Sequence, residues 1–313
     1  MNGRKNNVKC TINDGTTKIM LKYIEITCKT ACNRVNSDFL PFNWDLNIYR
    51  GCEHKCQYCF AVYSHKYMES DNFFDEIYVK KNIVECFEKQ ISSKRWKNTT
   101  VNIGGVTDSY QPAEKQYKLM PEILKLCIKY KVPVSLSTKS KLILRDFDLF
   151  AELATLVPVD ITCTITTLNE NIRKLIEPNA ASAKDRFNNL KEFSKTNVNT
   201  GIFIMPIIPE LTDSYNNLSM LYKTAKENNV NYAVTTILNL RGETKINFLN
   251  FVKNKLPHLY NKIKFYYKGA YVNSTYKKHI YNILNTLEEK YPLQEKEIVY
   301  PNYEKTDNQL TLF

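Results

Sequence analysis

Three cysteines stand close together in the segment NIYRGCEHKCQYCFAVYSHKYM, residues 47–68. Cys52, Cys56 and Cys59 have the spacing C-x3-C-x2-C. Thiolates in such groups bind zinc ions or iron–sulfur clusters. Three cysteines are one ligand short of the four that close a structural zinc site or hold a ferredoxin cluster. The spacing therefore predicts a metal centre that keeps one coordination position open for chemistry.

Two kinds of metal centre fit these three cysteines. We favour a four-iron, four-sulfur cluster with one open iron, and Tyr58 would then form an aromatic wall beside that iron. Zinc is the alternative, with His54 or His65 as the fourth ligand. Tyr58 is also one of 21 tyrosines in the chain, so an ordinary structural role for it stays open.

The other cysteines do not continue the pattern. Cys86, Cys127 and Cys163 fall on apolar faces of predicted helices and strands, where free cysteine behaves as a small hydrophobe. Cys28 and Cys32 form a second C-x3-C pair whose role the sequence leaves open. No cysteine follows Cys163, which excludes an auxiliary cysteine-ligated cluster in the C-terminal half.

The elements that must position the cysteines alternate between strands and helices. A strand or hairpin arm is expected over 17–28, and the last helix over 276–291. Between them we expect six strands, at 46–49, 99–105, 132–140, 159–167, 200–209 and 231–240, and helices at 82–91, 113–130, 145–156, 183–196 and 216–229. This alternation indicates βαβ units and a parallel sheet, which is either a barrel or partial barrel or an open doubly wound sheet.

Polar segments follow these strands where a parallel sheet places its active groups, at the carboxyl ends. The cysteine loop follows the first strand. The segments GVTDSYQP, STKS, TTLNE, MPIIPELTD and NLRGE follow the other five in order, and Pro206 and Pro209 are expected to end the fifth strand.

Composition sets limits on the class of protein. The chain has 313 residues, of which 43% are hydrophobic, so a large buried core is expected. The net charge of +12 favours a polyanionic partner such as nucleic acid or anionic lipid, although a biased codon composition would also supply many lysines. No run is apolar enough for a membrane span or a signal peptide, so we expect a cytoplasmic protein without disulfides.

Five ordered blocks resemble the radical S-adenosylmethionine (SAM) superfamily, and more narrowly its spore photoproduct lyase-like or "DNA repair photolyase" group. The blocks are LNIYRGCEHKCQYCFA, GGVTDSYQPAEKQY, STKSKLILRDFDLF, ITTLNENIRKLIEPNAASAKDR and MPIIPELTD. The resemblance covers roughly residues 25–240. It implies an α/β fold with a partial (β/α)6 barrel at 41–270, an N-terminal extension at 1–40, a C-terminal helix at 271–300 and a flexible tail at 301–313.

The resemblance also implies the chemistry. Cys52, Cys56 and Cys59 would hold a [4Fe-4S] cluster, and SAM would bind its open iron. An electron from a donor such as flavodoxin or ferredoxin would cleave SAM to a 5′-deoxyadenosyl radical, which removes a hydrogen atom from the substrate. Damaged or modified DNA is the expected substrate. RNA, a peptide or a small molecule is the alternative, and a zinc-stapled nucleic-acid-binding module without catalysis is a further one.

Several residues receive SAM-binding roles by position within the matched blocks. Gly104 and Gly105 would let the backbone approach the ligand, or would only make a tight turn. Thr107 and Asp108 would accept hydrogen bonds from the SAM ammonium. Lys139 would pair with the SAM carboxylate, unless it is a solvated surface lysine.

Two further pairs lie in the fourth block. Thr164 and Thr166 share one face of a strand and would bond the ribose hydroxyls, or would serve as β-branched filler. Glu177 and Arg186 match the family's "EP…R" block and are expected to form a structural ion pair or to face the substrate.

One departure from the family concerns the hydrogen donor. Spore photoproduct lyase uses a cysteine in the segment that corresponds to GGVTDSY, and Val106 stands at about that place here. Repair by the lyase's own route is therefore in doubt. Tyr110, in the same loop, is the candidate for a hydrogen donor or relay.

The chain ends in QLTLF, which resembles the pentapeptide by which bacterial DNA-processing proteins bind the sliding clamp. Leu312 and Phe313 would fill an apolar pocket beside Leu310, and Gln309 would fix the polarity by hydrogen bonds. A tethered motif raises the local concentration of an enzyme at DNA without tight binding by the enzyme itself. The alternative is that this end packs back on the barrel.

Overall fold

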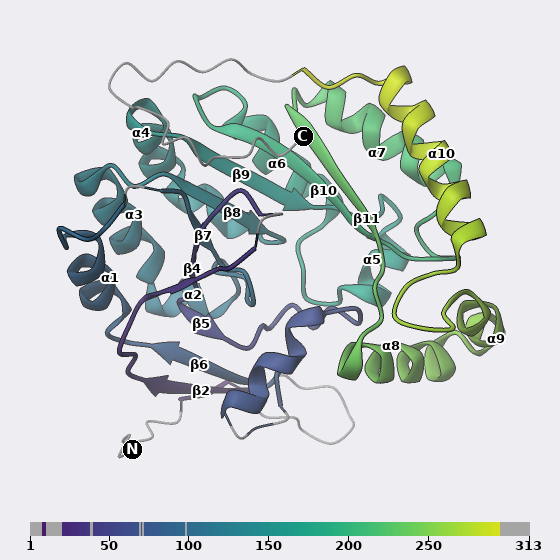
Figure 1. The fold of residues 1–313 in the computed structure, drawn as a ribbon, viewed down its shortest axis with the longest axis horizontal. Helices are drawn as coiled ribbons and strands as arrows, with labels where there is room; N and C mark the ends of the chain where they lie inside the picture. Colours follow the sequence, from purple (N-terminus) through teal and green to yellow (C-terminus); the bar gives the residue numbers. More distant parts are fainter. Residues whose placement is uncertain are drawn as a thin grey trace.

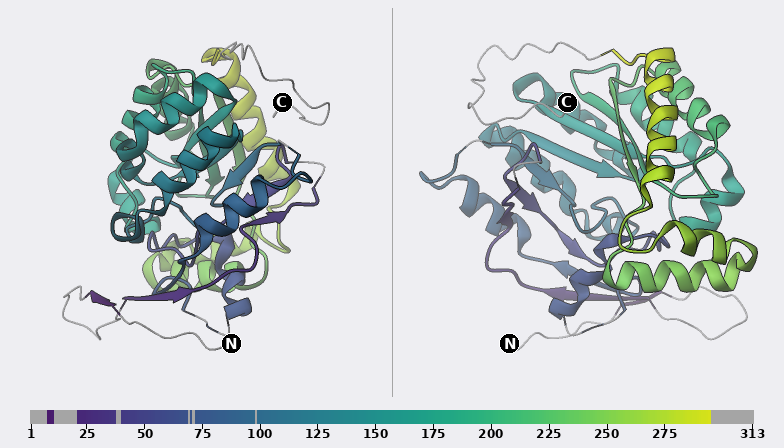
Figure 2. Two further views of the ribbon diagram at one scale, coloured as in Figure 1. Left: turned by 90° about the vertical axis from the view of Figure 1, so that its left-hand side faces the viewer. Right: turned by 45° about the vertical axis from the view of Figure 1, so that its right-hand side comes forward.

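A computed structural model describes residues 8–10, 21–37, 40–68, 70, 72–97 and 99–294 of the chain. Within these residues there are two β-sheets, a larger one above and a smaller one below in the view of Figure 1. Helices cover the outer side of the larger sheet (Figure 2). The described helices include none that is long and apolar enough to cross a membrane.

The larger sheet has the strand order β11-β10-β9-β8-β7-β4-β3. All neighbouring pairs are parallel except β3 and β4 at the edge. The six parallel strands confirm the predicted α/β class and the predicted number of βα units. The strands are β3 (Cys32–Arg34), β4 (Trp44–Leu46), β7 (Val101–Ile103), β8 (Val134–Thr138), β9 (Val159–Thr164), β10 (Asn199–Ile207) and β11 (Tyr232–Ile237).

Helices return the chain between the parallel strands. They bury apolar faces against the sheet, and four of them begin at a Ser or Asn whose side chain accepts a backbone N–H. The helices are α1 (Ile83–Ile91), α2 (Ala113–Tyr117), α3 (Leu119–Tyr130), α4 (Phe147–Leu156), α5 (Glu170–Ile176), α6 (Ala183–Phe193), α7 (Tyr215–Glu227), α8 (Gly242–Lys255), α9 (Pro257–Tyr266) and α10 (Ser274–Lys290), with 3-10 helices η1 (Phe60–Met68) and η2 (Lys141–Asp146).

The smaller sheet supports the cysteine loop. Its order is β1-β2-β6-β5, with β1 (Val8–Cys10), β2 (Leu21–Ile26), β5 (Tyr49–Arg50) and β6 (Glu76–Lys80). β2 lies within the arm predicted at 17–28. The cysteine loop leaves the end of β5 and runs into η1, so this sheet fixes where the loop begins.

The predicted first strand has the wrong bounds. β4 ends at Leu46, where the predicted strand starts, and Tyr49 belongs to β5 in the other sheet. The chain crosses between the sheets in the short link that holds Asn47. The Lys80 ammonium donates a 2.6 Å hydrogen bond to the carbonyl oxygen of Asn47 and holds this crossing in place.

The helix predicted over 113–130 is two helices. Lys118 takes a left-handed φ of 49° between α2 and α3. The carboxylate of Glu114 accepts the backbone N–H groups of Leu119 and Met120 at 3.1 and 3.0 Å, so it caps the start of α3. Pro206 does not end the fifth strand either, because β10 continues to Ile207.

Two helices that follow the sixth strand, α8 and α9, were not predicted. The proposed division of the chain into segments 1–40, 41–270, 271–300 and 301–313 stays a prediction. Most of its first segment and all of its last lie outside the described residues.

Candidate functional site

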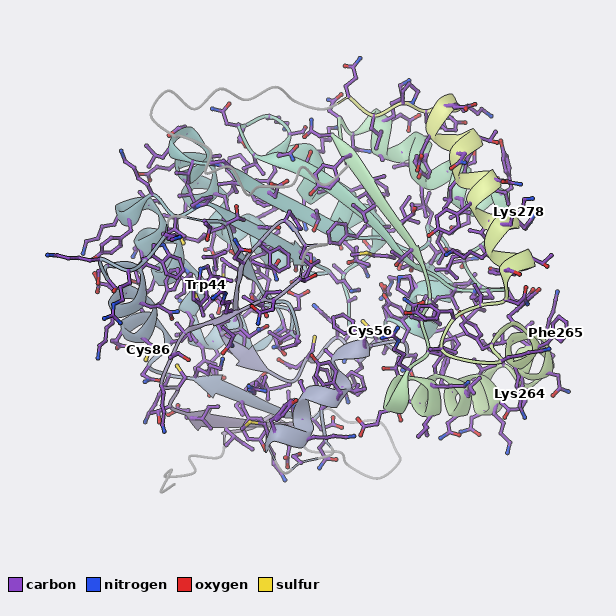
Figure 3. All side chains as sticks on the ribbon, viewed as in Figure 1. Trp44, Cys56, Cys86, Lys264, Phe265 and Lys278 are labelled. Carbon is purple, nitrogen blue, oxygen red and sulfur yellow. The ribbon has the colours of Figure 1, made fainter. Side chains whose placement is uncertain are left out.

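A cavity of about 370 Å³ opens at the carboxyl end of the parallel sheet. The carboxyl-terminal parts of parallel strands and several of the segments that follow them line it, although the predicted segment TTLNE at 166–170 contributes no residue to the lining. The lining consists of the cysteine loop, residues 104–108, residues 137–139, Thr164, Phe203, Met205, Pro206 and residues 236–239. Figure 3 shows Cys56 between the two sheets, where the loop faces these strand ends.

All three cysteines of the predicted metal centre line this cavity. Cys52 and Cys56 are buried and Cys59 is partly exposed. Gly51 makes the turn before Cys52 with a φ of +83°, and a Cβ there would lie 2.7 Å from a backbone oxygen of β6. Glycine is therefore required at this position because of both its conformation and the space around it.

The thiols suit a cluster better than a single ion. Burial raises the pKa of Cys56 to about 12 and that of Cys52 well above the usual range, so a metal must stabilise the thiolates. No three His, Cys, Asp or Glu side chains of the described residues converge on one ion position. A cluster does not need convergence, because each thiolate binds a different iron.

The two histidines named as zinc ligands have other partners. Nε2 of His54 lies 2.9 Å from Oδ2 of Asp108, and Nδ1 lies 3.3 Å from the carbonyl oxygen of Asn179. The His65 ring donates through Nε2 to the carbonyl oxygen of Glu76, 3.0 Å away, and does not line the cavity. Both ring nitrogens of His54 are therefore engaged, whereas Nδ1 of His65 has no hydrogen-bond partner among the described residues but belongs to a ring outside the cavity lining.

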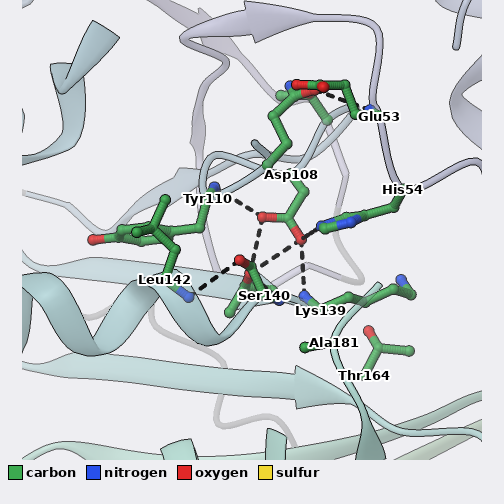
Figure 4. Close-up of polar contacts among 12 residues, drawn as sticks. Glu53, His54, Asp108, Tyr110, Lys139, Ser140, Leu142, Thr164 and Ala181 are labelled. Atoms are coloured by element: carbon green, nitrogen blue, oxygen red, sulfur yellow. Dashed lines mark hydrogen bonds and ion pairs between the residues drawn. The ribbon is translucent and has the colours of Figure 1, made fainter. Parts of the chain in front are cut away.

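Asp108 joins three strand-end loops (Figure 4). Besides the His54 ring, its carboxylate accepts the hydroxyl of Thr138 at 2.8 Å and the backbone N–H groups of Lys139 and Tyr110, both at 2.8 Å. Burial alone would raise the pKa of Asp108, but His54 and these donors outweigh burial and lower it to about 2. With its lone pairs used by the protein, Asp108 acts as a loop support.

The rest of the glycine-rich loop is also tied to the protein. The hydroxyl of Thr107 donates a 2.6 Å hydrogen bond to the carbonyl oxygen of Gly51. Gly104 has a φ of +93°, and a Cβ on Gly105 would lie 2.6 Å from the carboxylate of Asp45. These observations support the prediction that the two glycines make a tight turn. Both glycines also line the cavity.

Lys139 is a cation that faces the cavity. Its Nζ lies 5.8 Å from the centroid of the Tyr58 ring, and among the described residues it has no ion-pair partner. Burial opposes its charge, but Cys56 and Glu177 outweigh burial and raise the pKa of Lys139. The side chain therefore stays protonated and is available to an anionic ligand.

A buried chain of polar groups lies behind Tyr58. The Tyr58 hydroxyl donates to the carboxylate of Glu177, which pairs with Arg186 at 2.5 Å. Arg186 also donates to the carbonyl oxygens of Thr164 and Ala181 at 2.6 and 3.0 Å. The predicted structural ion pair is present, and it links the metal loop to the end of β9.

Some predicted site residues do not reach the cavity. Thr164 lines it, but Thr166 lies beyond the end of β9 and is not part of the lining. Tyr110 is buried in the core, where its hydroxyl donates to Asp146 at 2.9 Å and its ring packs on Phe150. Val106 does line the cavity, at the place where the family resemblance sets a cysteine.

Sequence reasoning missed the structural role of His54 and gave no role to Asn179. The Asn179 side chain donates a 2.7 Å hydrogen bond to the carbonyl oxygen of Glu53 and so closes the cysteine loop from the far side. The contact between His54 and Asp108 joins residues 54 positions apart along the chain, and the contact between Asn179 and Glu53 joins residues 126 positions apart. The predicted clamp motif, with Gln309, Leu310, Leu312 and Phe313, lies outside the described residues.

Comparison with protein families and known proteins adds an independent finding. Residues 46–221 match the model of the Radical SAM superfamily. The chain is 30% identical over 278 residues to an uncharacterized protein of Mycobacterium tuberculosis, covering 87% of this chain and 82% of that protein. It is also 30% identical over 270 residues to an uncharacterized protein of Methanocaldococcus jannaschii, covering 85% and 95%.

Among solved structures, the fold is similar to that of spore photoproduct lyase. A variant with bound AdoMet and dinucleoside spore photoproduct gives a TM-score of 0.62 at 12% identity, covering 87% of this chain and 81% of that one. Spore photoproduct lyase complexed with dinucleoside spore photoproduct gives a TM-score of 0.64 over the same shares. At this identity the likeness shows the fold alone.

Proposed function

The chain belongs to the radical SAM superfamily, and we propose that its substrate is damaged or modified DNA. Its cofactors are a [4Fe-4S] cluster and SAM. One observation carries the proposed site. The three cysteines, the carboxyl ends of parallel strands and Lys139 line the same cavity, and Lys139 has no ion-pair partner among the described residues.

Cys52, Cys56 and Cys59 fit the cluster by their residue type and by the cavity that they share. When bound, the cluster supplies an electron that cleaves SAM into methionine and the radical that starts the reaction. Lys139 supplies the positive charge for the SAM carboxylate, and Thr164 supplies a hydroxyl at the cavity wall for the ribose. The chain's own task is to hold these groups and to keep water from the cavity.

Asp108 and Thr107 have a different task from the one predicted. Their side chains already bond to protein groups, so we assign them to holding the loop 104–108 against the cavity. Backbone groups of that loop are then the part that meets SAM. Tyr110 has no place in the reaction because its side chain lies in the core.

Two observations support DNA as the substrate. The fold is similar to that of a lyase whose solved structures hold a dinucleoside spore photoproduct, and the chain carries a net charge of +12. The residue at the cavity wall that corresponds to the lyase's donor cysteine is Val106, so another group returns the hydrogen atom. Flavodoxin or ferredoxin as electron donor, and the sliding clamp as a partner of residues 309–313, complete the proposal.

Anaerobic turnover tests the proposal directly. The cluster-loaded enzyme is incubated with SAM, a reductant and one of four substrates: ultraviolet-irradiated DNA, untreated DNA, irradiated RNA or a pool of metabolites. We expect 5′-deoxyadenosine and a changed nucleotide, both detected by mass spectrometry, only with irradiated DNA. Turnover that depends on RNA or on a metabolite instead would overturn the DNA assignment and leave the radical chemistry intact.

A further inference from the structure

The positive charge of the chain is concentrated in one segment. Residues 241–281 contain nine Lys or Arg and a single acidic residue, a net charge of +8 out of +12 for the whole chain. The other 272 residues therefore carry only +4. We call the surface of this segment, which comprises α8, α9 and the first half of α10, the basic face. These helices lie together at the right-hand edge of the molecule (Figures 1 and 2).

Most of this charge is exposed and has no counter-charge. Lys262 pairs with Glu210 at 2.7 Å, and the one acid of the segment, Glu243, pairs with Lys66 at 3.0 Å. Within the described part of the chain, no other cation of the basic face has an ion-pair partner. The unpaired exposed cations are Arg241, Lys253, Lys255, Lys264, Lys268, Lys277 and Lys278. Figure 3 shows Lys264 and Lys278 pointing outward from this edge.

Exposed aromatic rings lie among these cations. Phe265 is 69% exposed and Tyr271 is 55% exposed, whereas large aromatic side chains are mostly buried in folded proteins. The Arg241 guanidinium lies 5.0 Å from the centroid of the Tyr271 ring. Cations that hold phosphates beside rings that stack on bases are the combination by which proteins bind single-stranded nucleic acid.

The basic face is continuous with the cavity. Leu238 and Asn239 line the cavity and lead directly into Arg241 and α8. The hydroxyl of Thr244, in the first turn of α8, donates a 3.3 Å hydrogen bond to the carbonyl oxygen of Cys59. A strand held along α8 and α9 therefore ends beside the metal loop.

We propose that the basic face binds single-stranded DNA and leads an unpaired nucleotide to the cavity. Lys264 and Lys268 hold the backbone phosphates, and Phe265 and Tyr271 stack on bases. The inference rests on the proposed function, since it names the form of DNA that the cavity receives, but binding is measured separately from turnover.

Fluorescence anisotropy with a labelled 20-nucleotide single strand tests the face, using the cluster-loaded enzyme under anaerobic conditions. The variant Lys264→Glu/Lys268→Glu is compared with Lys184→Glu/Lys191→Glu, which makes the same charge change at exposed, unpaired lysines of α6. We expect the first variant to weaken binding at least tenfold and to reduce the salt dependence of log K by about 1.4, for two phosphate contacts on a single strand. The α6 variant changes binding less than threefold.

A second pair of variants tests the stacking of bases on aromatic rings. Phe265→Ala is compared with Tyr215→Ala, which removes a ring that is 47% exposed at the start of α7. We expect about a tenfold loss for Phe265→Ala and less than a twofold loss for Tyr215→Ala. Circular dichroism spectra and iron contents equal to those of the wild type show that all four variants are folded and loaded with the cluster.

Four outcomes would overturn the inference: equal effects in the two charge variants, no effect of Phe265→Ala, tighter binding of duplex than of single strand, or equal binding of RNA or anionic phosphatidylserine vesicles. If the wild type binds single strands as expected but turns over no DNA, the face stands and the proposed substrate fails. If DNA is turned over without dependence on Lys264 and Lys268, the proposed substrate stands and the face fails.

Discussion

Replacing Asp108 by asparagine tests the central contact of the site. The carboxylate accepts from the His54 ring, the Thr138 hydroxyl and the N–H groups of Lys139 and Tyr110. Each carboxylate oxygen faces one of the two backbone N–H donors. An asparagine must place its NH2 group against one or the other, so neither orientation of the amide restores the hydrogen bonds.

The expected loss follows from the pKa. The ordinary value of 3.8 falls to about 2 for Asp108, because His54 and the N–H donors outweigh burial. At about 1.36 kcal/mol for each pKa unit, the ionised carboxylate contributes about 2.5 kcal/mol to the free energy of unfolding at pH 7. Because the pKa of Asp108 is lowered, this stabilisation is present above pH 3.8 and is lost as the pH falls toward 2. Roughly half is left at pH 3.

Urea unfolding of the cluster-free protein, followed by circular dichroism, measures the difference between wild type and Asp108→Asn, since acid dissolves an iron–sulfur cluster. We expect about 2 to 3 kcal/mol at pH 7 and a smaller difference at pH 3. Asp148→Asn, at an exposed position in the first turn of α4, serves as the control and changes stability by less than about 1 kcal/mol. A difference under 0.5 kcal/mol, or one that does not change with pH, refutes the assigned role of Asp108.

Four further predictions concern the metal, SAM, the core and the tail. Cys56→Ala removes the bound iron and abolishes SAM cleavage, as shown by iron analysis and absorbance. Lys139→Met weakens SAM binding by roughly ten- to hundredfold in calorimetry, whereas the exposed Lys141→Met leaves it unchanged; equal effects contradict the carboxylate role. Arg186→Met leaves the buried Glu177 without its ion-pair partner and lowers the free energy of unfolding by about 3 to 5 kcal/mol in urea; a loss below 1 kcal/mol would contradict the role of this ion pair. Deleting residues 309–313 abolishes binding to purified sliding clamp in surface plasmon resonance, and unchanged binding ends the clamp proposal.

The sequence predicted the parallel sheet well because its strands are apolar runs separated by amphipathic helices. The long apolar segments at 159–167 and 200–209 became β9, which is buried along nearly its whole length, and β10, whose Phe203 and Met205 are only partly buried. The first strand was misplaced by a few residues, since the chain changes sheets at Asn47 and a tertiary hydrogen bond, not a local pattern, fixes that point. The break at Lys118 likewise depends on a side chain that caps the following helix.

The site was predicted by position and less well by orientation. The rule that active groups follow parallel strands brought the cysteines, Lys139 and Thr164 to one cavity. It says nothing about where a side chain points, so Tyr110 was expected in the site although its ring enters the core. The sequence also could not predict that His54 contacts Asp108, because the two residues are 54 positions apart and no sequence motif links them.

The backbone of the cysteine loop is fastened to its surroundings by protein groups alone. The N–H of Gln57 donates to the carbonyl oxygen of Ile176 at 2.9 Å, and Asn179 bonds the loop at Glu53. The placement of the three thiolates therefore depends on the end of α5 and the segment that follows it, which hold the loop through Ile176 and Asn179. A substitution at Asn179, outside the cysteine motif, is thus expected to disturb the cluster ligands through the backbone that carries them.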